Sequence, residues 1–392
     1  MNIEKFIDFE FFLKEEEIQI KEMAKKFVNE KFLPIVNECH RAGKFPLEII
    51  NNMAELGFFG APFSDFNLPN LSPTEYGLLM LELERGDSGL RSFVSVQNSL
   101  VMFPILKWGS KEQKENFIPK LASGELIGCY GLTEPDFGSN PAGMRTNLKK
   151  TKDGYFLNGS KAWITNGTIA DIAVVWAKDE EGNIRGVIVE KGMKGFVSKE
   201  IKGKFSLRAS DTAELFFEDV FIDEEHILPE ANSLRHPLSC LNEARFGIAW
   251  GAIGSALATS EYALNYAKER KQFKDKPIAT HQIIQEKLVF MATEISKAFS
   301  LMLHLSKLKE KGILKHYQVS LAKRNNVNIA RECARLSREI LGAQGIVDEH
   351  PVIRHMLNLE SVYTYEGTND IHTLIVGEYL TGFRAYNPPQ ED

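Results

Sequence analysis

The chain has 392 residues, of which 43% are hydrophobic, so it is long enough for two or three domains with apolar cores. Its 47 basic and 53 acidic residues give a net charge of -6, and no basic block is interleaved with aromatic residues, which argues against nucleic acid as a partner. The four cysteines are widely separated and the nine histidines form no His-x-x-x-His pair, so neither a disulfide framework nor a metal site is expected.

The sequence gives no sign of a membrane span or a targeting segment. No uninterrupted apolar run approaches the length of a span, and Met1 to Glu10 lack a signal-peptide core and an Arg-rich transit character. We therefore expect a cytoplasmic protein, or one of the mitochondrial matrix if a transit peptide has been removed.

The first third of the chain has the apolar spacing of helices. This spacing runs from about Phe11 to Leu121 and is broken by glycine and proline, which predicts an all-helical domain over residues 1–125. The breaks are at Gly43, Pro46, Pro69 and Pro73.

The period changes after Gly128 and predicts a closed or sandwiched β-sheet domain over residues 126–235. Tight turns are expected at Asp153-Gly154 and Asn158-Gly159, and the segments Asp171 to Trp176 and Arg185 to Glu190 are expected to form a hairpin. A second hairpin is expected over Glu214 to Ile222.

The helical period returns for the rest of the chain. Three long helices are expected over Leu241 to Arg270, His281 to Lys311 and His316 to Gly342, and short connections between them indicate a bundle over residues 236–392. The sequence thus predicts an α+β protein of several domains.

Two segments near the helix-to-sheet boundary have residues suited to a heteroaromatic ligand. The loop Tyr130 to Ser139 combines glycines with hydroxyls, which is typical of a loop that binds a polar ring or phosphate, although a plain interdomain turn explains it equally well. Trp163 and Thr165 share a face of a predicted strand, where the indole either walls a flavin or fills the core.

Two cationic positions lie on predicted helices. Arg91 and Ser95 are four residues apart in a mostly apolar run and either clasp a carboxylate or lie solvated on the surface. Arg270, Lys271, Gln272 and Phe273 end a long helix, where cations complement the helix dipole and would also attract a diphosphate.

Glu366 follows Tyr365 and precedes Gly367 in a loop before an amphipathic run. Asn369 or Asp370 is expected to cap the helix that follows. Partial desolvation beside Tyr365 would raise the pKa of Glu366 and make it a general base, whereas the alternative is an ordinary solvated loop acid.

Taken together, these segments resemble the acyl-CoA dehydrogenase family, and within it the glutaryl-CoA dehydrogenases. The resemblance covers nearly the whole chain, and the family fold is a helical domain, a β-barrel and a four-helix bundle. Its motifs are Gly131 to Pro135, Trp163 to Thr165, Lys204 to Ser210, Asn242 to Trp250 and Tyr365 to Asp370.

The resemblance implies FAD as cofactor, an acyl-CoA thioester as substrate and a homotetramer. Thr133 and Thr165 would bond the flavin edge, and the nucleotide end would be held partly across a subunit interface. The implied FAD-binding residues are Tyr130, Leu132, Thr133, Gly138, Ser139, Trp163, Thr165, Arg270, Phe273, Gln282, Gly342, Thr368 and Asp370. The implied substrate-binding residues are Glu84, Arg91, Ser92, Ser95, Ser139, Arg245, Tyr365 and Gly367.

The resemblance also implies a reaction. Glu366 would remove the thioester α-proton while a hydride leaves the β-carbon for flavin N5, and electrons would pass to an electron-transferring flavoprotein. Arg91 would bind the distal carboxylate of glutaryl-CoA. Tyr365 and Glu84 match the decarboxylating members, which implies crotonyl-CoA and carbon dioxide as products.

Three alternatives remain open from the sequence. One is a short straight-chain acyl-CoA dehydrogenase, or an oxidase that uses oxygen directly, and another is a non-decarboxylating glutaryl-CoA dehydrogenase that releases glutaconyl-CoA. A helical interaction protein that has lost catalysis is the alternative from another class, although the retained Glu366, Thr133, Trp163 and Thr165 argue against it.

Overall fold

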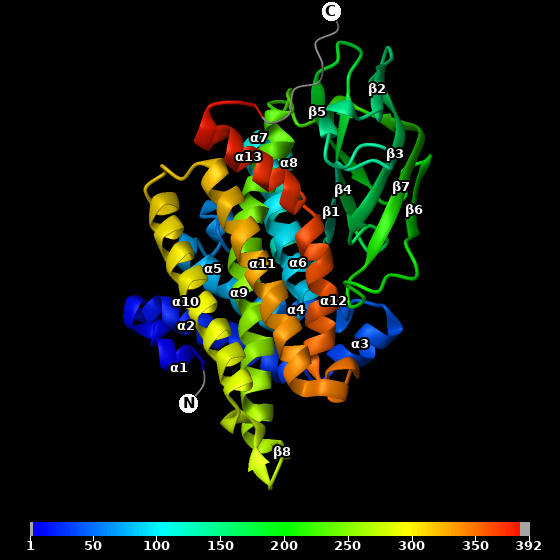
Figure 1. Ribbon diagram of the computed structural model, residues 1–392. Coiled ribbons are helices and arrows are strands. Elements are labelled where there is room, and N and C mark those ends of the chain that lie inside the picture. Colours follow the sequence, from blue (N-terminus) through cyan, green and yellow to red (C-terminus); the bar gives the residue numbers. More distant parts are fainter. Residues whose placement is uncertain (1–2, 385–392) are drawn as a thin grey trace, which may run out of the picture.

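The computed structural model describes residues 3–384, and both the first residues, Met1 and Asn2, and residues 385–392 lie outside it. A curved sheet lies against one side of a body of long helices (Figure 1). The order of helices, sheet and helices confirms the predicted fold class.

The first helical region contains eight α-helices. Helix α5 begins at Pro73, and the side chain of Ser72 accepts a hydrogen bond from the Glu75 backbone N–H as its cap. A π-helical stretch, Val96–Met102, joins α6 to α7. The helices are α1 Ile3–Ile7, α2 Glu15–Phe27, α3 Val36–Ala42, α4 Ile50–Glu55, α5 Pro73–Gly86, α6 Ser88–Ser95, α7 Phe103–Trp108 and α8 Lys111–Ala122.

The middle region is a seven-stranded sheet with the order β1-β4-β2-β3-β7-β6, and β5 pairs with β4. Within the described chain β1, β5 and β6 have one strand partner each, so the sheet is a half-barrel with open edges. The strands are β1 Gly128–Gly131, β2 Asn147–Lys150, β3 Tyr155–Thr165, β4 Ile172–Lys178, β5 Ile184–Glu190, β6 Phe196–Glu200 and β7 Thr212–Ile222.

The predicted β4–β5 hairpin is confirmed, but two other local predictions are wrong. Asn158-Gly159 lies inside β3 at a shift in the pairing with β7, because Gly159 has a φ of 140° that suits a bulge. Glu214 to Ile222 belongs to one continuous strand, β7. Asp219 has a φ of 47° but does not turn the chain, because β7 pairs with β3 on both sides of it, and the first part of the segment alternates buried Leu215 and Phe217 with exposed Phe216 and Glu218.

The last region is the helical bundle, with helices close to the predicted ranges. They are α9 Arg235–Glu269, α10 Gln282–Glu310, α11 His316–Leu341, α12 Pro351–Thr364 and α13 Asn369–Thr381, and a small hairpin of β8 Lys271–Gln272 and β9 Lys276–Pro277 follows α9. Among the described helices, α10 alone has the length and apolar composition of a membrane span, with 33% of that window buried.

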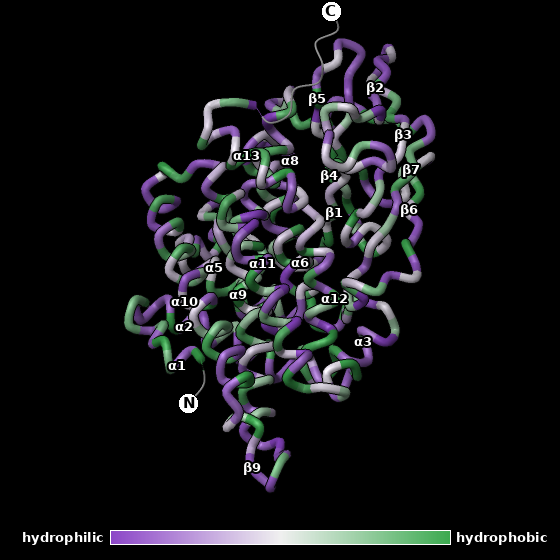
Figure 2. Tube along the Cα trace, viewed as in Figure 1, coloured by the Kyte–Doolittle hydropathy of each residue, from purple (hydrophilic) through white to green (hydrophobic). Residues whose placement is uncertain are grey.

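Close helix contacts build the main core from the first region and the bundle together. A Cβ on Gly254 of α9 would lie 2.0 Å from the Leu81 carbonyl oxygen of α5, so glycine permits this approach. Trp250 is fully buried beside it and meets Phe299 edge-on at 5.5 Å. The residues of this core come from α5, α9 and α11 among others, and hydrophobic and hydrophilic positions are mixed along these helices (Figure 2).

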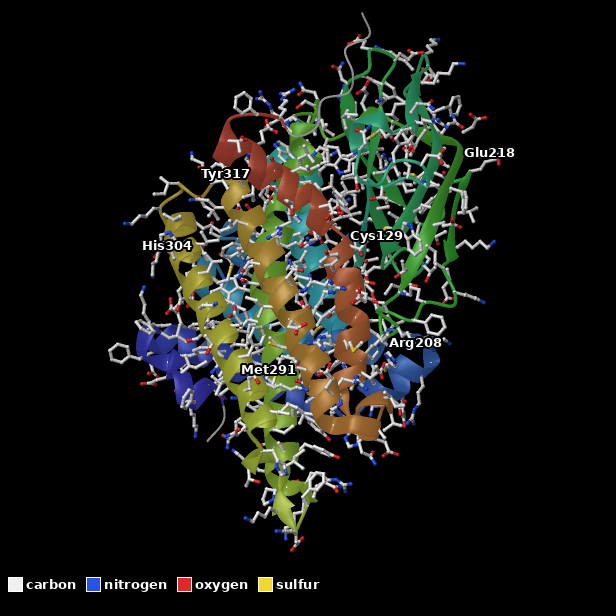
Figure 3. The ribbon with its side chains drawn as sticks, viewed as in Figure 1. Cys129, Arg208, Glu218, Met291, His304 and Tyr317 are labelled. Carbon is white, nitrogen blue, oxygen red and sulfur yellow. The ribbon has the colours of Figure 1, made fainter. Side chains whose placement is uncertain are left out.

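Polar contacts fix the sheet region against the helices. Arg208, labelled in Figure 3, donates from Nε to the His40 carbonyl and from Nη2 to the Arg41 carbonyl of α3, both at 2.8 Å. On α6, Asp87 caps the helix and also accepts from Arg354 and Asn358 of α12. The contacts of Asp87 hold α6 against α12. These two helices carry or adjoin the candidate site.

Candidate active site

Glu366 lies in the short loop between α12 and α13. It has a φ of 52°, in the left-handed region, and Gly367 follows with a φ of 97°. The left-handed region costs a non-glycine residue about 1–2 kcal/mol, so the surrounding contacts must hold this turn in place. The turn buries Glu366 Oε2, which has no hydrogen-bond partner among the described residues.

The capping residue of α13 differs from the prediction. Thr368 caps the helix, because its Oγ1 accepts from the Ile371 backbone N–H at 3.2 Å. Asn369 and Asp370 were expected there, but both lie inside the first turn, where the exposed Asp370 still complements the helix dipole.

The carboxyl of Glu366 is not the solvated loop acid that the sequence left possible. Burial raises its pKa, while the positive charges of Arg91, Lys323 and Arg245 oppose that rise. A half-buried carboxylate with one buried, unpaired oxygen and a raised pKa is a suitable proton acceptor at neutral pH.

Arg91 of α6 is fully buried, so the surface alternative for this residue is wrong. Its Nε donates to Glu84 Oε2 at 2.6 Å, and its Nη2 donates to the hydroxyl of Tyr365. Its Nη1 and the Oγ of Ser95, one turn further along α6, have no hydrogen-bond partner in the described chain. Buried donors are rarely left unpaired, so these two groups are prepared for an acceptor from outside the chain.

Three more predicted substrate residues surround Arg91. Glu84 of α5 is fully buried and also accepts from the Ser88 hydroxyl at 2.9 Å. Burial raises the pKa of Tyr365, so its hydroxyl stays neutral. Ser92 is buried next to Arg91 on α6.

Two cations bond the backbone of the Glu366 loop. Arg245 of α9 donates from Nε to the Glu366 carbonyl at 2.7 Å. Lys323 of α11 donates from Nζ to the carbonyl of Tyr365 at 2.8 Å and to that of Gly367 at 2.7 Å. Sequence reasoning placed Arg245 at the CoA channel and missed Lys323. The sequence feature that could have identified Lys323 is its position, because it is a lysine among the apolar positions of a predicted helix.

The flavin side of the site is built on β3. Trp163 has 65% of its side chain exposed and a φ of 63°, so the core alternative for it is wrong. The Ala162 N–H donates to the Thr133 carbonyl at 2.9 Å, which brings the loop after β1 beside the indole. Thr133 and Thr165 are half-buried, and their hydroxyls make no hydrogen bond within residues 3–384. An open indole with two free hydroxyls fits the ring of a flavin.

The loop Tyr130 to Ser139 is anchored through a buried ion pair. Lys161 Nζ lies 2.9 Å from Glu134 Oε1, and Glu134 also accepts from the Arg145 and Thr146 backbone N–H groups. The predicted contact residues differ in exposure: Tyr130 and Leu132 are buried, whereas Gly138 and Ser139 are exposed. The Tyr130 hydroxyl donates to the Pro237 carbonyl at 3.1 Å.

Four predicted FAD-binding residues are not brought to this site by the chain itself. Arg270 follows α9, Phe273 lies between β8 and β9, Gln282 begins α10 and Gly342 follows α11, and all four are exposed. The β8–β9 hairpin lies at the end of the bundle away from α13 (Figure 1). Their roles, and those of the other predicted site residues, stay predictions.

Family models match the chain in three consecutive parts. They are the acyl-CoA dehydrogenase N-terminal domain over residues 14–125, the middle domain over 129–220 and the C-terminal domain over 234–381. Together these matches span most of the chain.

Individual proteins agree with the family models. A short-chain specific acyl-CoA dehydrogenase of Megasphaera elsdenii is 34% identical, with 91% of this chain and 96% of that protein covered. The crystal structure of a glutaryl-CoA dehydrogenase from Mycobacterium smegmatis is 48% identical, with a TM-score of 0.97 and with 98% of this chain and 100% of that chain covered. A structure of a glutaryl-CoA dehydrogenase from the same organism in complex with FADH2 is 45% identical, with a TM-score of 0.94 and coverages of 96% and 97%.

Proposed function

Since the chain belongs to the acyl-CoA dehydrogenase family and FAD is its cofactor, we propose that it oxidises glutaryl-CoA and decarboxylates the product to crotonyl-CoA and carbon dioxide. The observation that carries this proposal is Arg91, a buried guanidinium with one nitrogen unpaired beside the unpaired Ser95 hydroxyl.

Glu366 is the base that takes the α-proton of the thioester. This proton is weakly acidic, so its removal requires stabilisation of the enolate that forms, and the Glu366 backbone N–H supplies a donor for the thioester oxygen. FAD, when bound, accepts the hydride from the β-carbon. Trp163, Thr133 and Thr165 hold its ring and exclude water on that side.

Arg91 Nη1 and Ser95 Oγ bind the distal carboxylate of the substrate. Glu84 and Tyr365 hold the guanidinium in place, so the donors are fixed before the substrate arrives. The removal of one partner of a buried charged pair costs about 2–5 kcal/mol, or roughly 30-fold to several thousand-fold in affinity. That range is large enough to set the choice of substrate.

Decarboxylation follows from the same groups. The bond between the γ-carbon and the carboxyl carbon breaks, carbon dioxide leaves, and the electron pair passes into a dienolate of the thioester. Glu366 returns its proton to the γ-carbon, which gives crotonyl-CoA. Tyr365, whose hydroxyl accepts a hydrogen bond from Arg91 Nη2, is the residue on which this outcome chiefly depends.

A cavity of about 370 Å³, whose lining residue Asn242 accepts a hydrogen bond from Arg245 Nη1 at 3.2 Å, supports a CoA thioester as the substrate. It is lined on α9 by Asn242 and Phe246, and by Lys315 and His316 where α11 begins. Lys309 at its wall is paired with the Glu243 carboxylate, which leaves Lys315 as the cation suited to a phosphate of CoA.

Product analysis tests the proposal. Purified protein is incubated with glutaryl-CoA and an electron acceptor, and mass spectrometry identifies the thioester product. We expect crotonyl-CoA. Glutaconyl-CoA would show oxidation without decarboxylation, and no turnover of glutaryl-CoA beside turnover of butyryl-CoA would indicate a short-chain acyl-CoA dehydrogenase.

Substitution of Arg91 tests the carboxylate clasp. We expect Arg91→Ala to lower kcat/KM for glutaryl-CoA by at least about 30-fold, and to change kcat/KM for butyryl-CoA much less. Arg335→Ala, which removes a partly exposed arginine of α11, is the matched control. Equal losses on both substrates would contradict the clasp.

The proposed electron acceptor is an electron-transferring flavoprotein. It should support turnover in place of an artificial acceptor, whereas equal activity with oxygen alone would indicate an oxidase.

A further inference from the structure

Lys323 occupies a position where helical periodicity demands an apolar side chain. It lies on the buried face of α11, with Val319 and Ser320 one turn before it and Asn326 and Val327 one turn after it, all of them buried. Only 1% of Lys323 is exposed. A lysine at such a position is expensive to bury and therefore requires partners.

The partners of Lys323 are two peptide carbonyls rather than a carboxylate. Its Nζ donates to the oxygens of Tyr365 and Gly367, at 2.8 and 2.7 Å, so the two bonds flank Glu366 on both sides. Arg245 donates to the carbonyl between them, that of Glu366 itself. Three successive carbonyls of one loop thus accept from two buried cations of two different helices.

From this arrangement we propose that Lys323 is a positioning residue: it clamps the carbonyls on both sides of Glu366 and, with Arg245, holds the loop in the left-handed turn that aims the Glu366 carboxylate at the substrate. The inference rests on the proposed role of Glu366 as base. Glu366 has a positive φ that glycine would adopt without strain. The hydrogen bonds of the clamp offset this backbone strain.

Lys323 also acts on Glu366 through its charge. Burial lowers the pKa of Lys323 to about 7, while the charge of Glu366 opposes that decrease and the charges of Arg245 and Arg91 add to it. His372 of α13 lies close enough to feel the charge of Lys323. Burial lowers the pKa of His372 to about 2, so its ring stays neutral. The Tyr365 ring lies 5.8 Å from Nζ.

The test is Lys323→Met in the FAD-loaded enzyme, which removes the donors and the charge but keeps a side chain of similar length. We expect kcat for glutaryl-CoA to fall about 100-fold, as expected for a misplaced catalytic group, with KM changed only a few-fold. The acidic limb of the pH profile should move up by about one pH unit, because a positive charge near the base is lost.

A second measurement does not depend on turnover. Amide hydrogen exchange in peptides that cover residues 362–370 should become faster in Lys323→Met, because the loop loses two of its hydrogen bonds. Lys21→Met is the control, since Lys21 is another buried lysine, 3% exposed, in the first helical region. It should lower the melting temperature and leave kcat and loop exchange unchanged. If Lys323→Met does not fold, Lys323→Gln is measured in the same way.

The outcomes separate this inference from the proposed function. Wild-type kcat, pH profile and loop exchange in Lys323→Met would overturn the clamp and leave the base assignment intact. Substantial activity in Glu366→Gln would overturn the base assignment, while faster loop exchange in Lys323→Met would still support a clamp on the loop.

Discussion

At the scale of single residues, the candidate site is a set of buried groups that the fold leaves unsatisfied. Arg91 Nη1, Ser95 Oγ and Glu366 Oε2 are all buried without a hydrogen-bond partner in the described chain. An unmet buried donor or acceptor costs about 1–3 kcal/mol, so a fold retains several of them in one place at the expense of stability. This pattern is the one expected of a binding site for a charged ligand.

Gly251 of α9 makes room for the pair that holds Arg91. A Cβ at this position would lie 2.3 Å from Glu84 Oε2 and 3.2 Å from Arg91 Cδ. We expect Gly251→Ala to displace the Glu84 carboxylate, to raise KM for glutaryl-CoA more than for butyryl-CoA, and to cost about 1–3 kcal/mol of stability.

Steady-state kinetics on both substrates and a melting curve check this prediction. Gly377→Ala in α13 is the control, because a Cβ there meets nothing within 4 Å. It should leave both substrates unaffected and stabilise the helix slightly. A Gly251→Ala enzyme with unchanged kinetics would show that the pair tolerates the extra methyl group.

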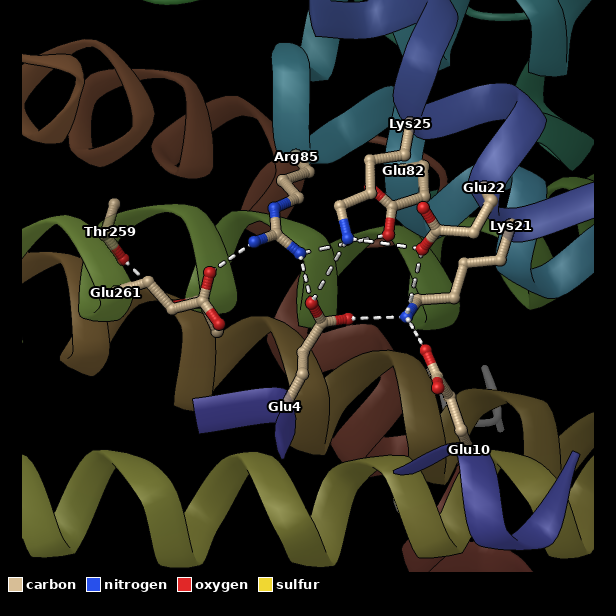
Figure 4. A network of polar contacts seen from close by, with 10 residues as sticks. Glu4, Glu10, Lys21, Glu22, Lys25, Glu82, Arg85, Thr259 and Glu261 are labelled. Carbon is tan, nitrogen blue, oxygen red and sulfur yellow. Dashed lines mark hydrogen bonds and ion pairs between the residues drawn. The ribbon is translucent and has the colours of Figure 1, made fainter. Parts of the chain in front are cut away.

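At the scale of elements, an ionic network fastens the N-terminal helix α1 to α2, α5 and α9 (Figure 4). Glu4 lies 2.9 Å from Arg85 Nη1 and 3.1 Å from Lys21 Nζ. Burial alone would raise the pKa of Glu4, but Arg85 and Lys21 lower it to about 2. Glu82 is also buried in this network, where neither oxygen accepts a hydrogen bond from the described residues, and burial raises its pKa to about 7.

These two glutamates have opposite effects on stability as the pH changes. The raised pKa of Glu82 means that the folded state loses stability as pH rises from about 4.5 to about 7, on the order of 3 kcal/mol. We therefore expect Glu82→Gln to raise the melting temperature at pH 8.5 and to change it little at pH 4.5.

Glu4→Gln gives the matched comparison. The lowered pKa of Glu4 contributes stability above about pH 4.5 that is lost as pH falls toward 2, so this variant should be less stable than wild type at neutral pH. Melting curves at both pH values measure the two effects. The same shift of Glu82→Gln at both pH values would contradict a pH-dependent cost at Glu82.

At the scale of the whole molecule, α10 exposes three large apolar side chains near its beginning. Ile283, Val289 and Phe290 are 68%, 65% and 40% exposed. By length and composition alone, α10 is also long and apolar enough to span a membrane. An exposed apolar face of this kind is typical of an interface. The family resemblance implies a homotetramer, so we expect a second copy of the chain to cover this face.

We expect the protein to be a homo-oligomer that Ile283→Glu with Val289→Glu dissociates, because two buried charges would lie at the interface. Size-exclusion chromatography with light scattering measures the mass of each variant. Val197→Glu, at a similarly exposed valine of β6, is the control and should keep the wild-type mass. A monomeric wild-type protein would contradict the prediction.

The sequence by itself determined the order of helical, sheet and helical regions, because the apolar period changes with the secondary structure. Motif order was also sufficient for the family. Local geometry did not follow from the sequence. The bulge at Gly159 depends on the register with the partner strand, and the cap at Thr368 depends on where α13 begins, which the neighbouring loop decides.

Only the tertiary structure decided that Arg91 and the Oε2 atom of Glu366 are buried and that each residue keeps an unpaired polar atom, since burial depends on helices far apart in the chain. It alone brought Lys323 beneath the Glu366 loop, because a contact between residues 323 and 367 follows from the packing of α11 against α12 and α13 and from no local pattern.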